Sequence, residues 1–197
     1  MSLLPAKVNR LRVDTFSDYW LTFKSFIWDD PVEIDSGVYL GNMSHSFFRH
    51  SLDSFNINAI VNVTGEFPNY YEGDKKYLTI RIEDLQDATI HDQLETTYQF
   101  ICQQLYYGNV LIHCMFGRSR SVAVCVYYLM RKYDLSFEDA YQRIQQLKPS
   151  VNLNLKFANE IRGGGAPGGA PGGAPGGAPP PPLTPSLTIS PKSPHLL

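Results

Sequence analysis

The chain has 197 residues, of which 43% are hydrophobic, and it carries a formal net charge of −2 at pH 7. This length and apolar content predict one domain with a sizeable core plus tails. A nearly neutral chain gives no electrostatic reason to expect binding to nucleic acid or to an acidic membrane. Three cysteines are too few, and odd in number, for a disulfide framework, and no stretch resembles a membrane span or a signal peptide. These features predict a soluble protein of a reducing intracellular compartment, cytoplasmic or nuclear.

Residues 1–31 are expected to form a loose tail followed by an amphipathic helix. Between Asp14 and Asp30, large apolar residues recur at three- and four-residue spacing, which is typical of a helix with one apolar face. The stripe consists of Phe16, Tyr19, Trp20, Phe23, Phe26 and Ile27. We favour a helix packed on the following domain. A homodimer or partner face is the alternative, since so aromatic a stripe cannot stay exposed in a soluble monomer.

Residues 32–162 alternate between short β-branched stretches and longer amphipathic ones. Strands are predicted at Val32–Ile34, Val38–Leu40, Ile57–Thr64, Lys76–Glu83 and Val110–Ile112. Helices are predicted at Ser44–Phe55, Asp92–Tyr107, Ser121–Lys132, Ser136–Pro149 and Leu153–Ile161. Such an order predicts an α/β domain with a mostly parallel central sheet, covered by helices on both faces. Cys102 and Cys125 lie in apolar helical stretches and are predicted to be core residues.

The composition changes abruptly after Arg162. Residues 163–182 form a linker that contains four copies of Gly-Gly-Ala-Pro, a regularity that favours an engineered fusion over a natural segment. Residues 183–197 form a tail peptide with Ser-Pro and Thr-Pro pairs. Because a flexible linker gives a tethered peptide a high effective concentration, the tail is either a ligand in cis or trans or an unstructured end.

One stretch combines the features of a phosphate-handling site. An apolar strand from Val110 runs into His113 and Cys114, then through a turn containing Gly117 to Arg120 and an apolar helix. A strand–loop–helix unit of this kind gathers backbone N–H groups and a helix N-terminus around one point, which suits an anion. The same field favours the thiolate form of a cysteine, and the Arg120 fork matches the oxygens of a phosphate. The stretch predicts a phosphoryl-transfer enzyme that uses a thiolate nucleophile.

The Cys-x5-Arg-Ser pattern after a hydrophobic strand and His113 resembles the signature of the cysteine-based protein tyrosine phosphatase superfamily. Its Ser-Arg-Ser ending, Ser119 to Ser121, is most similar to the dual-specificity branch, and the resemblance runs from Val32 to Ile161. The family usually has a small residue where Phe116 stands. This departure concerns the pocket wall and leaves the backbone cradle intact.

The resemblance implies roles for individual residues. Cys114 would be the nucleophile, Arg120 would bind the phosphate oxygens, and Ser121 would assist departure of the thiolate. Asp84 best fits the position of the general acid, with Asp87 as the runner-up. The substrate-binding residues would be Met115, Phe116, Gly117, Arg118 and Ser119, and the supporting residues His113 and Asn152. The reaction needs no cofactor, and the chain contains no metal-ligand spacing.

The implied function is hydrolysis of phosphotyrosine and of phosphoserine or phosphothreonine in proteins. Apolar Met115 and Phe116 would favour an aromatic substrate. The alternative is an adaptor that binds phosphoproteins with little or no turnover. Activity on lipids or RNA 5′ ends is disfavoured, because no basic stripe is present. Basic and then apolar residues within residues 7–13 resemble a docking motif for MAP kinases, although a solvated basic tail is the favoured interpretation.

Overall fold

The computed structural model describes residues 29–82 and 89–163. The chain divides into two units, residues 1–167 and 168–197, and every described residue belongs to the first. The predicted N-terminal aromatic helix, the linker and the tail peptide therefore lie outside the described residues, apart from the last three residues of the 1–31 segment and the first of the linker.

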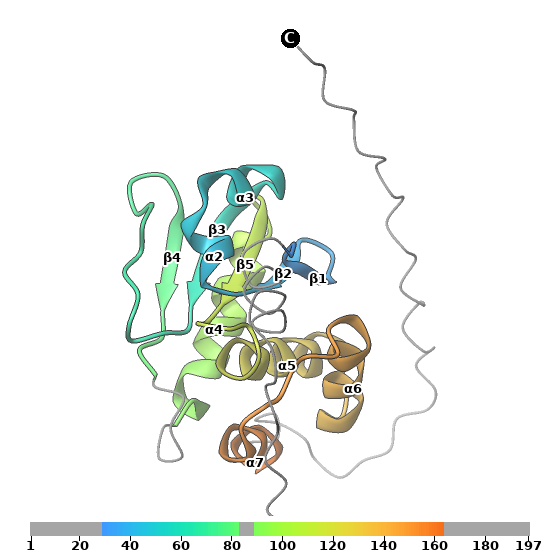
Figure 1. The fold of residues 1–197 in the computed structure, drawn as a ribbon. Helices are drawn as coiled ribbons and strands as arrows, with labels where there is room; N and C mark the ends of the chain where they lie inside the picture. The colour runs from blue at the N-terminus through green and yellow to red at the C-terminus, as the bar shows by residue number, and fades with distance from the viewer. Residues whose placement is uncertain (1–28, 83–88, 164–197) are drawn as a thin grey trace, which may run out of the picture. The chain divides into compact units, whose positions relative to one another are not determined.

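A five-stranded sheet forms the centre of the described part, in the order β1-β2-β5-β3-β4 (Figure 1). The strands are β1 (Val32–Asp35), β2 (Val38–Gly41), β3 (Ile57–Asn62), β4 (Lys76–Thr79) and β5 (Asn109–His113). The β1–β2 pair is an antiparallel hairpin that turns at Gly37, where φ is +75°. The other three pairs are parallel, so the predicted mostly parallel sheet is confirmed.

Helices cover both faces of this sheet (Figure 1). They are α2 (Met43–Phe47), α3 (Arg49–Ser54), α4 (His91–Gln104), α5 (Arg120–Tyr133), α6 (Phe137–Leu147) and α7 (Leu155–Gly163). Helix α4 packs on β3 and β5, α5 packs on β2 and β5, and α6 and α7 pack against α5. On the other face, α3 packs on β3, and α2 contacts β2 and β5. The α/β architecture predicted from the alternation of strands and helices is confirmed.

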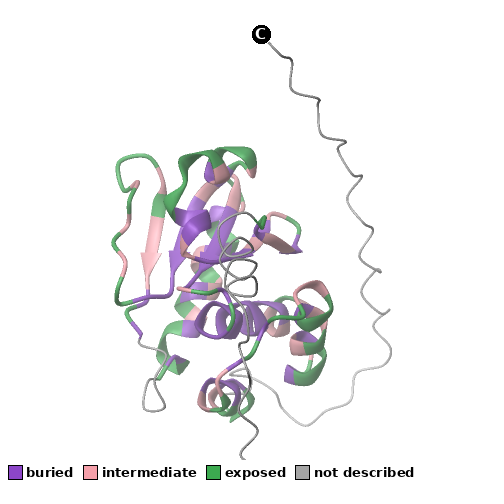
Figure 2. Ribbon diagram, in the orientation of Figure 1, coloured by how far each residue is buried: buried purple, intermediate pink, exposed green. Residues whose placement is uncertain are grey.

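The strand β5 shows why this sheet is buried on both faces. Successive side chains of a strand point to opposite faces, and Val110 and Ile112 accordingly join the core beneath α5, whereas Leu111 joins a second cluster with Leu52 of α3. A strand buried on both faces must be apolar throughout, as this one is. Figure 2 shows the consequence as buried residues concentrated in the central strands and in α5.

The predicted helix Ser44–Phe55 is wrong in one respect, because the structure breaks it into α2 and α3 at Phe48. Phe48 is extended, with φ −83° and ψ 114°. The carbonyl oxygen of Phe47 accepts a hydrogen bond of 2.6 Å from the hydroxyl of Tyr71. Phe47 also packs edge-on against Tyr70, with ring centroids 4.9 Å apart. These contacts with a distant segment replace the local helical bonds, which a periodicity argument cannot anticipate.

Two further sequence predictions also need correction. The strand predicted at Lys76–Glu83 ends at Thr79. Cys102, predicted to be a core residue, is exposed, whereas Cys125 is fully buried. The buried stripe of α4 consists of Leu94, Thr97, Ile101 and Gln104. Cys102 lies beside that stripe and faces solvent, so an apolar neighbourhood in the sequence was insufficient to place it.

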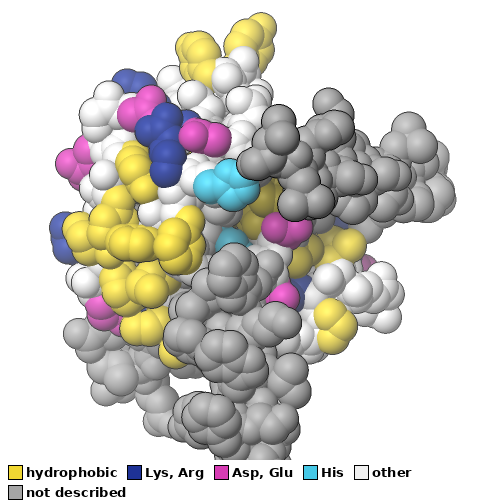
Figure 3. Space-filling model, turned by 45° about the horizontal axis from the view of Figure 1, so that its top comes forward, with side chains coloured by type: hydrophobic (Ala, Val, Ile, Leu, Met, Phe, Trp, Pro, Cys, Tyr) yellow, Lys and Arg dark blue, Asp and Glu magenta, His cyan; other side chains and the backbone are white. Residues whose placement is uncertain are grey.

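The two exposed residues Phe47 and Phe48 pack against each other and belong to a small aromatic surface with Tyr70. Figure 3 shows apolar side chains gathered on the viewed face of the molecule.

Among the described residues, no helix is both long and apolar enough to cross a bilayer.

A buried acid ties the sheet edge to α5. Asp35, which is 6% exposed, accepts hydrogen bonds from Lys132 Nζ at 2.6 Å, Tyr133 Oη at 2.6 Å and Tyr128 Oη at 2.9 Å. Burial raises the pKa of Asp35, but the hydrogen bonds from Lys132 and the two tyrosines outweigh it and hold the pKa below its ordinary value. The charged form of Asp35 therefore stabilises the fold.

We expect Asp35→Asn to lower the free energy of unfolding by about 2 kcal/mol at pH 7, a value discounted for the partial exposure of Lys132. Because the folded-state pKa is depressed, this contribution is complete above about pH 4 and is lost as the pH falls through the folded-state pKa. Urea denaturation at several pH values measures both effects. Asp53→Asn, in an exposed pair with Arg49, is the control and should change nothing measurable. Equal stability of Asp35→Asn and wild type at pH 7 would contradict the prediction.

Candidate active site

The stretch that suggested phosphate chemistry forms a loop at the carboxyl end of β5. We define the signature loop as residues 114–119, between β5 and the first residue of α5, Arg120. Strand β5 lies between β2 and β3, to both of which it is parallel. Open α/β sheets bind ligands outside the carboxyl ends of such strands. The fold therefore places the loop where a ligand site is expected.

Cys114 begins the loop as a buried residue, 2% exposed. Its Sγ atom accepts a hydrogen bond of 3.1 Å from the hydroxyl of Ser121, which is itself fully buried in the first turn of α5. Cys125 lies one turn further along α5, and burial raises its pKa, so that residue stays a neutral thiol. The two cysteines thus differ in their surroundings: only Cys114 lies in the loop, next to a hydroxyl donor.

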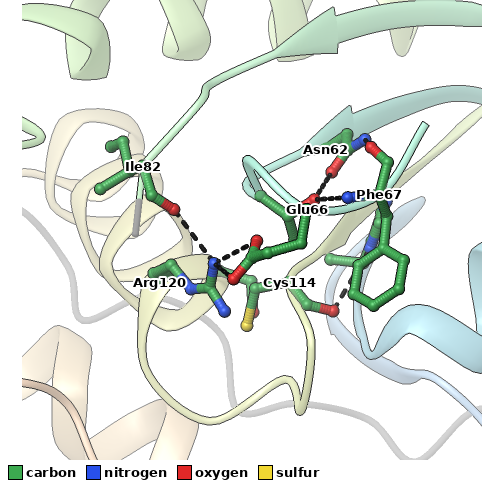
Figure 4. Close-up of polar contacts among 9 residues, drawn as sticks. Asn62, Glu66, Phe67, Ile82, Cys114 and Arg120 are labelled. Atoms are coloured by element: carbon green, nitrogen blue, oxygen red, sulfur yellow. Dashed lines mark hydrogen bonds and ion pairs between the residues drawn. The ribbon is translucent and has the colours of Figure 1, made fainter. Parts of the chain in front are cut away.

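The guanidinium of Arg120 is held by two acceptor groups, a carboxylate and a backbone carbonyl. Its Nη1 atom donates to Glu66 Oε1 and Oε2 at 3.1 and 2.9 Å and to the carbonyl oxygen of Ile82 at 3.0 Å (Figure 4). Burial raises the pKa of Glu66, but the hydrogen bonds from Arg120 and the backbone outweigh it and leave the pKa below its usual value. Arg120 is 4% exposed, and its Nε atom is buried without a hydrogen-bond partner among the described residues.

The outer side of the signature loop is held by backbone donors of neighbouring segments. The N–H of Met43, in the first turn of α2, donates to the carbonyl of Met115 at 3.1 Å, and the N–H of Asn152 donates to the carbonyl of Arg118 at 2.9 Å. In a trans peptide the C=O and the following N–H point in opposite directions. The N–H groups that follow these two carbonyls therefore point away from α2 and from the segment before α7, toward the inner side of the loop.

The first turn of α5 keeps its backbone donors available because Ser119 does not cap the helix with its side chain. The hydroxyl of Ser119 instead accepts the N–H of Asn154 at 3.2 Å, while the side chain of Asn154 caps α7 by accepting from the N–H of Lys156 at 2.9 Å. A helix N-terminus whose N–H groups lack a side-chain cap attracts an anion.

Gly117 gives the loop its turn. Its φ is +64°, and a Cβ atom built on it would lie 2.5 Å from the carbonyl oxygen of Gly41 and 3.0 Å from Lys148 Nζ. An L side chain would thus be strained in conformation and would clash with backbone of β2. Lys148, the other residue that this Cβ would approach, is partly buried, and burial lowers the pKa of its amino group. Only glycine fits at this point of the loop.

Two buried histidines beside the loop are neutral near pH 7. Burial lowers the pKa of His113 to about 4, and its Nδ1 lies 3.4 Å from the carbonyl oxygen of Cys114. Burial also lowers the pKa of His45. The Nδ1 atom of His45 accepts the N–H of Asn42 at 3.0 Å, and its Nε2 donates to the carbonyl of Asp29 at 2.6 Å, an arrangement that requires a neutral ring.

The remaining predicted residues lie at the rim. Met115 is half-buried, Phe116 is 59% exposed, and Arg118 is exposed with its Nε donating to the carbonyl of Ser150 at 2.9 Å. Asn152 is exposed and reaches the loop only through its backbone N–H. The predicted acid Asp84 and the runner-up Asp87 lie outside the described residues.

Sequence reasoning missed two residues that contact the site. Asn154 could have been recognised as the cap of the last helix, since Asn is a preferred N-cap residue. Glu66 carried no such signal, because its contact with Arg120 joins segments 54 residues apart. Within the described ranges, no group of three or more His, Cys, Asp or Glu side chains is placed to hold a metal ion.

Comparison with known proteins identifies the family. The protein-family model for the catalytic domain of dual specificity phosphatases matches residues 38–163 of the chain. Human dual specificity protein phosphatase 4 is 34% identical over 136 residues, which cover 66% of this chain and 34% of that protein. Human dual specificity protein phosphatase 1 is 33% identical over 132 residues, covering 66% of this chain and 36% of that protein.

Solved structures agree with this assignment. Human DUSP28 has a TM-score of 0.64 at 25% identity, over 68% of this chain and 91% of that chain. A mouse putative dual specificity phosphatase, complexed with zinc tungstate, has a TM-score of 0.64 at 26% identity, over 68% of this chain and 85% of that chain.

The protein is thus a member of the cysteine-based protein tyrosine phosphatase superfamily. Within it, the chain belongs to the dual specificity phosphatases. It spans about a third of the length of the curated relatives it matches.

We expect Gly117→Ala to weaken the binding of tungstate, a phosphate-shaped oxyanion, by about tenfold or more, because the new Cβ must displace the backbone of Gly41 or distort the loop. Isothermal titration calorimetry on the full chain measures the affinity. Gly73→Ala is the matched control, since a Cβ there meets nothing within 4 Å. Wild-type affinity in Gly117→Ala would show that the loop tolerates a side chain at its turn.

Proposed function

We propose that the protein hydrolyses phosphotyrosine and phosphoserine or phosphothreonine in proteins through a cysteinyl-phosphate intermediate. The observation that carries this proposal is the convergence of three groups at the carboxyl end of β5. Cys114 Sγ accepts from Ser121 Oγ, and Arg120, the neighbour of Ser121, is buried with its Nε unpartnered among the described residues. A nucleophile, a hydroxyl donor and an oxyanion-binding fork are the components that a phosphoryl-transfer site of this type requires.

In the first step, the thiolate of Cys114 attacks phosphorus in line with the ester oxygen. The S–P bond forms, the P–O ester bond breaks, and the leaving oxygen takes a proton from a general acid, for which Asp84 is the proposed residue. Arg120 and the loop N–H groups stabilise the equatorial oxygens, where charge is spread in the transition state. Because His113 is neutral, with a pKa of about 4, it supplies no positive charge to the thiolate. Its proposed role is to organise the loop through the carbonyl of Cys114.

In the second step, water attacks the phosphorus of the cysteinyl-phosphate. The ionised Asp84 takes the proton from that water, the S–P bond breaks, and its electron pair returns to sulfur as the thiolate. The hydroxyl of Ser121 is proposed to stabilise this leaving thiolate, a role supported by its hydrogen bond of 3.1 Å to Sγ. The cycle ends with inorganic phosphate and the thiolate that began it.

The rim residues bear on substrate choice. Phe116 is 59% exposed next to the half-buried Met115, so both are available to an aromatic ring. The proposed preference is therefore for phosphotyrosine within a dual specificity.

The basic stretch in residues 7–13 and the tail peptide 183–197 both lie outside the described residues. Docking to MAP kinases and tethered binding by the tail remain proposals that rest on sequence alone, as does a reducing intracellular location.

We expect the full chain to release phosphate from phosphotyrosyl and phosphothreonyl peptides, with phosphotyrosyl preferred, and Cys114→Ser to lose this activity by about a thousandfold or more because the nucleophile is removed. Malachite-green detection of phosphate measures the rates. Phosphoinositide and RNA 5′-triphosphate are included as competing substrates. Binding of phosphopeptides without release of phosphate would favour the adaptor alternative instead.

We expect Asp84→Asn to lower kcat by about a hundredfold on alkyl phosphates and far less on aryl phosphates with good leaving groups, since only a poor leaving group needs the proton. Asp87→Asn, three residues away, is the matched comparison and should have little effect. Steady-state rates over a series of leaving groups measure the dependence. If Asp87→Asn shows this pattern and Asp84→Asn does not, the assignment of the acid moves to Asp87.

A further inference from the structure

A groove begins at the signature loop and continues along the start of α7. Its lining comes from Ser119, the last residue of the loop, and from residues between Asn152 and Asn159. The groove has a volume of about 750 Å³, which is within the range of clefts that bind ligands. Helix α7 packs against α5 (Figure 1), and the N–H groups of Asn152 and Asn154 donate to the carbonyl of Arg118 and to the hydroxyl of Ser119. These two hydrogen bonds join the groove to the signature loop.

The lining of the groove suits a polypeptide. Three of its side chains are the amides of Asn152, Asn154 and Asn159, and each amide offers both donors and an acceptor, as a peptide backbone does. Leu155, which is 78% exposed, adds apolar contact area in the same groove. Clefts that bind ligands combine apolar surface with a few placed polar groups in this way. An extended segment of a protein fits these groups better than a small ion does.

The groove is positively charged. Among the described residues that line it, Lys156 is the ionisable one, and its side chain is 33% exposed. Its ion-pair partner on α7 is Glu160, whose Oε1 lies 4.0 Å from Lys156 Nζ, a separation longer than a hydrogen bond. The other oxygen of Glu160, Oε2, accepts the N–H groups of Ile90 and His91 at 2.8 and 3.2 Å. Because Glu160 is committed chiefly to the start of α4, the lining presents a cation and no carboxylate to a ligand.

We propose that this groove binds the segment of a phosphoprotein substrate that flanks the phosphorylated residue, and that Lys156 selects segments with Asp or Glu residues. This inference deepens the proposed function, on which it rests. A substrate whose phosphate lies in the signature loop must cross the surface beside that loop, and Ser119 belongs to both the loop and the groove. The acidic preference follows from charge complementarity, since charges at the rim of an interface act mainly on specificity and association rate.

The test uses variants outside the proposed catalytic residues. Lys156→Gln removes the charge and keeps most of the apolar stem, Lys156→Glu reverses the charge, and Asn159→Ala removes one amide. Lys76→Glu is the matched control, because Lys76 is an exposed lysine on the edge strand β4 and does not line the groove. Thermal unfolding of each full-length variant checks that it folds. Should Lys156→Glu fail to fold, Lys156→Gln gives the same comparison with a smaller expected effect.

The first readout is kcat/KM for three phosphotyrosyl peptides, which have neutral flanks, glutamates before the phosphotyrosine, or glutamates after it. We expect the wild type to prefer one acidic peptide over the neutral one by about fivefold, Lys156→Gln to lose this preference and Lys156→Glu to reverse it. The preference should vanish in 1 M salt, where the screening length is about 3 Å. Asn159→Ala should lower kcat/KM for all three peptides by about threefold. A small aryl phosphate, which does not extend into the groove, should be hydrolysed at the wild-type rate by every variant.

The second readout is calorimetric affinity for the same peptides with a non-hydrolysable phosphonate in place of the phosphate ester, which needs no turnover. The variants should fall in the same order. If the wild type binds these peptides with the acidic preference but hydrolyses no phosphate ester, the proposed function fails while the groove is supported.

Three results would overturn the proposal. The first is a wild type without any acidic preference. The second is an equal effect of Lys76→Glu and Lys156→Glu, because the preference would then reflect overall charge. The third is a loss on the small aryl phosphate as large as the loss on the peptides, since Lys156 would then act on the signature loop instead of on the peptide.

Discussion

The close approach of Gly117 to Gly41 is the constraint on which the site depends. The signature loop can pass so near β2 only because Gly117 has no side chain, since a Cβ atom on it would lie 2.5 Å from the carbonyl oxygen of Gly41. Once there, its carbonyls meet the N–H groups of Met43 and Asn152. With these oxygens satisfied on the outer side, the intervening N–H groups must point inward, since peptide planarity couples the two. The direction of these inner N–H groups is thus a consequence of how the outer side is packed.

The electrostatics of the site follow from burial. Two histidines lie beside the loop, yet burial lowers the pKa of each, so neither is a cation near neutral pH. The buried guanidinium of Arg120, in the same surroundings, has hydrogen bonds to Glu66 and to the carbonyl of Ile82 in place of the water it has lost. Arginine and histidine respond differently to burial. A guanidinium keeps its proton in a low-dielectric site and an imidazole does not, so charge resides on Arg120 while His113 contributes a hydrogen bond.

Local sequence signals predicted the elements well where burial and periodicity agree. Strand β5 is apolar because both its faces are covered. It lies between β2 and β3, and its side chains are divided between the two apolar clusters. The signals failed where a distant contact decides the outcome. The break at Phe48 depends on Tyr70 and Tyr71, and the exposure of Cys102 depends on which stripe of α4 meets the core. Propensity and composition contain no information about such partners.

The amino-acid sequence by itself determined the α/β architecture, the family and the location of Cys114 and Arg120, because these depend on periodicity and on a short contiguous motif. Only the tertiary structure decided which other groups meet that motif. Glu66 and Asn154 reach the loop region from other segments, and Asn152, which stood at the expected place in sequence, contributes only its backbone. Contacts between segments far apart in sequence are set by how strands and helices pack, and a linear pattern does not encode that packing.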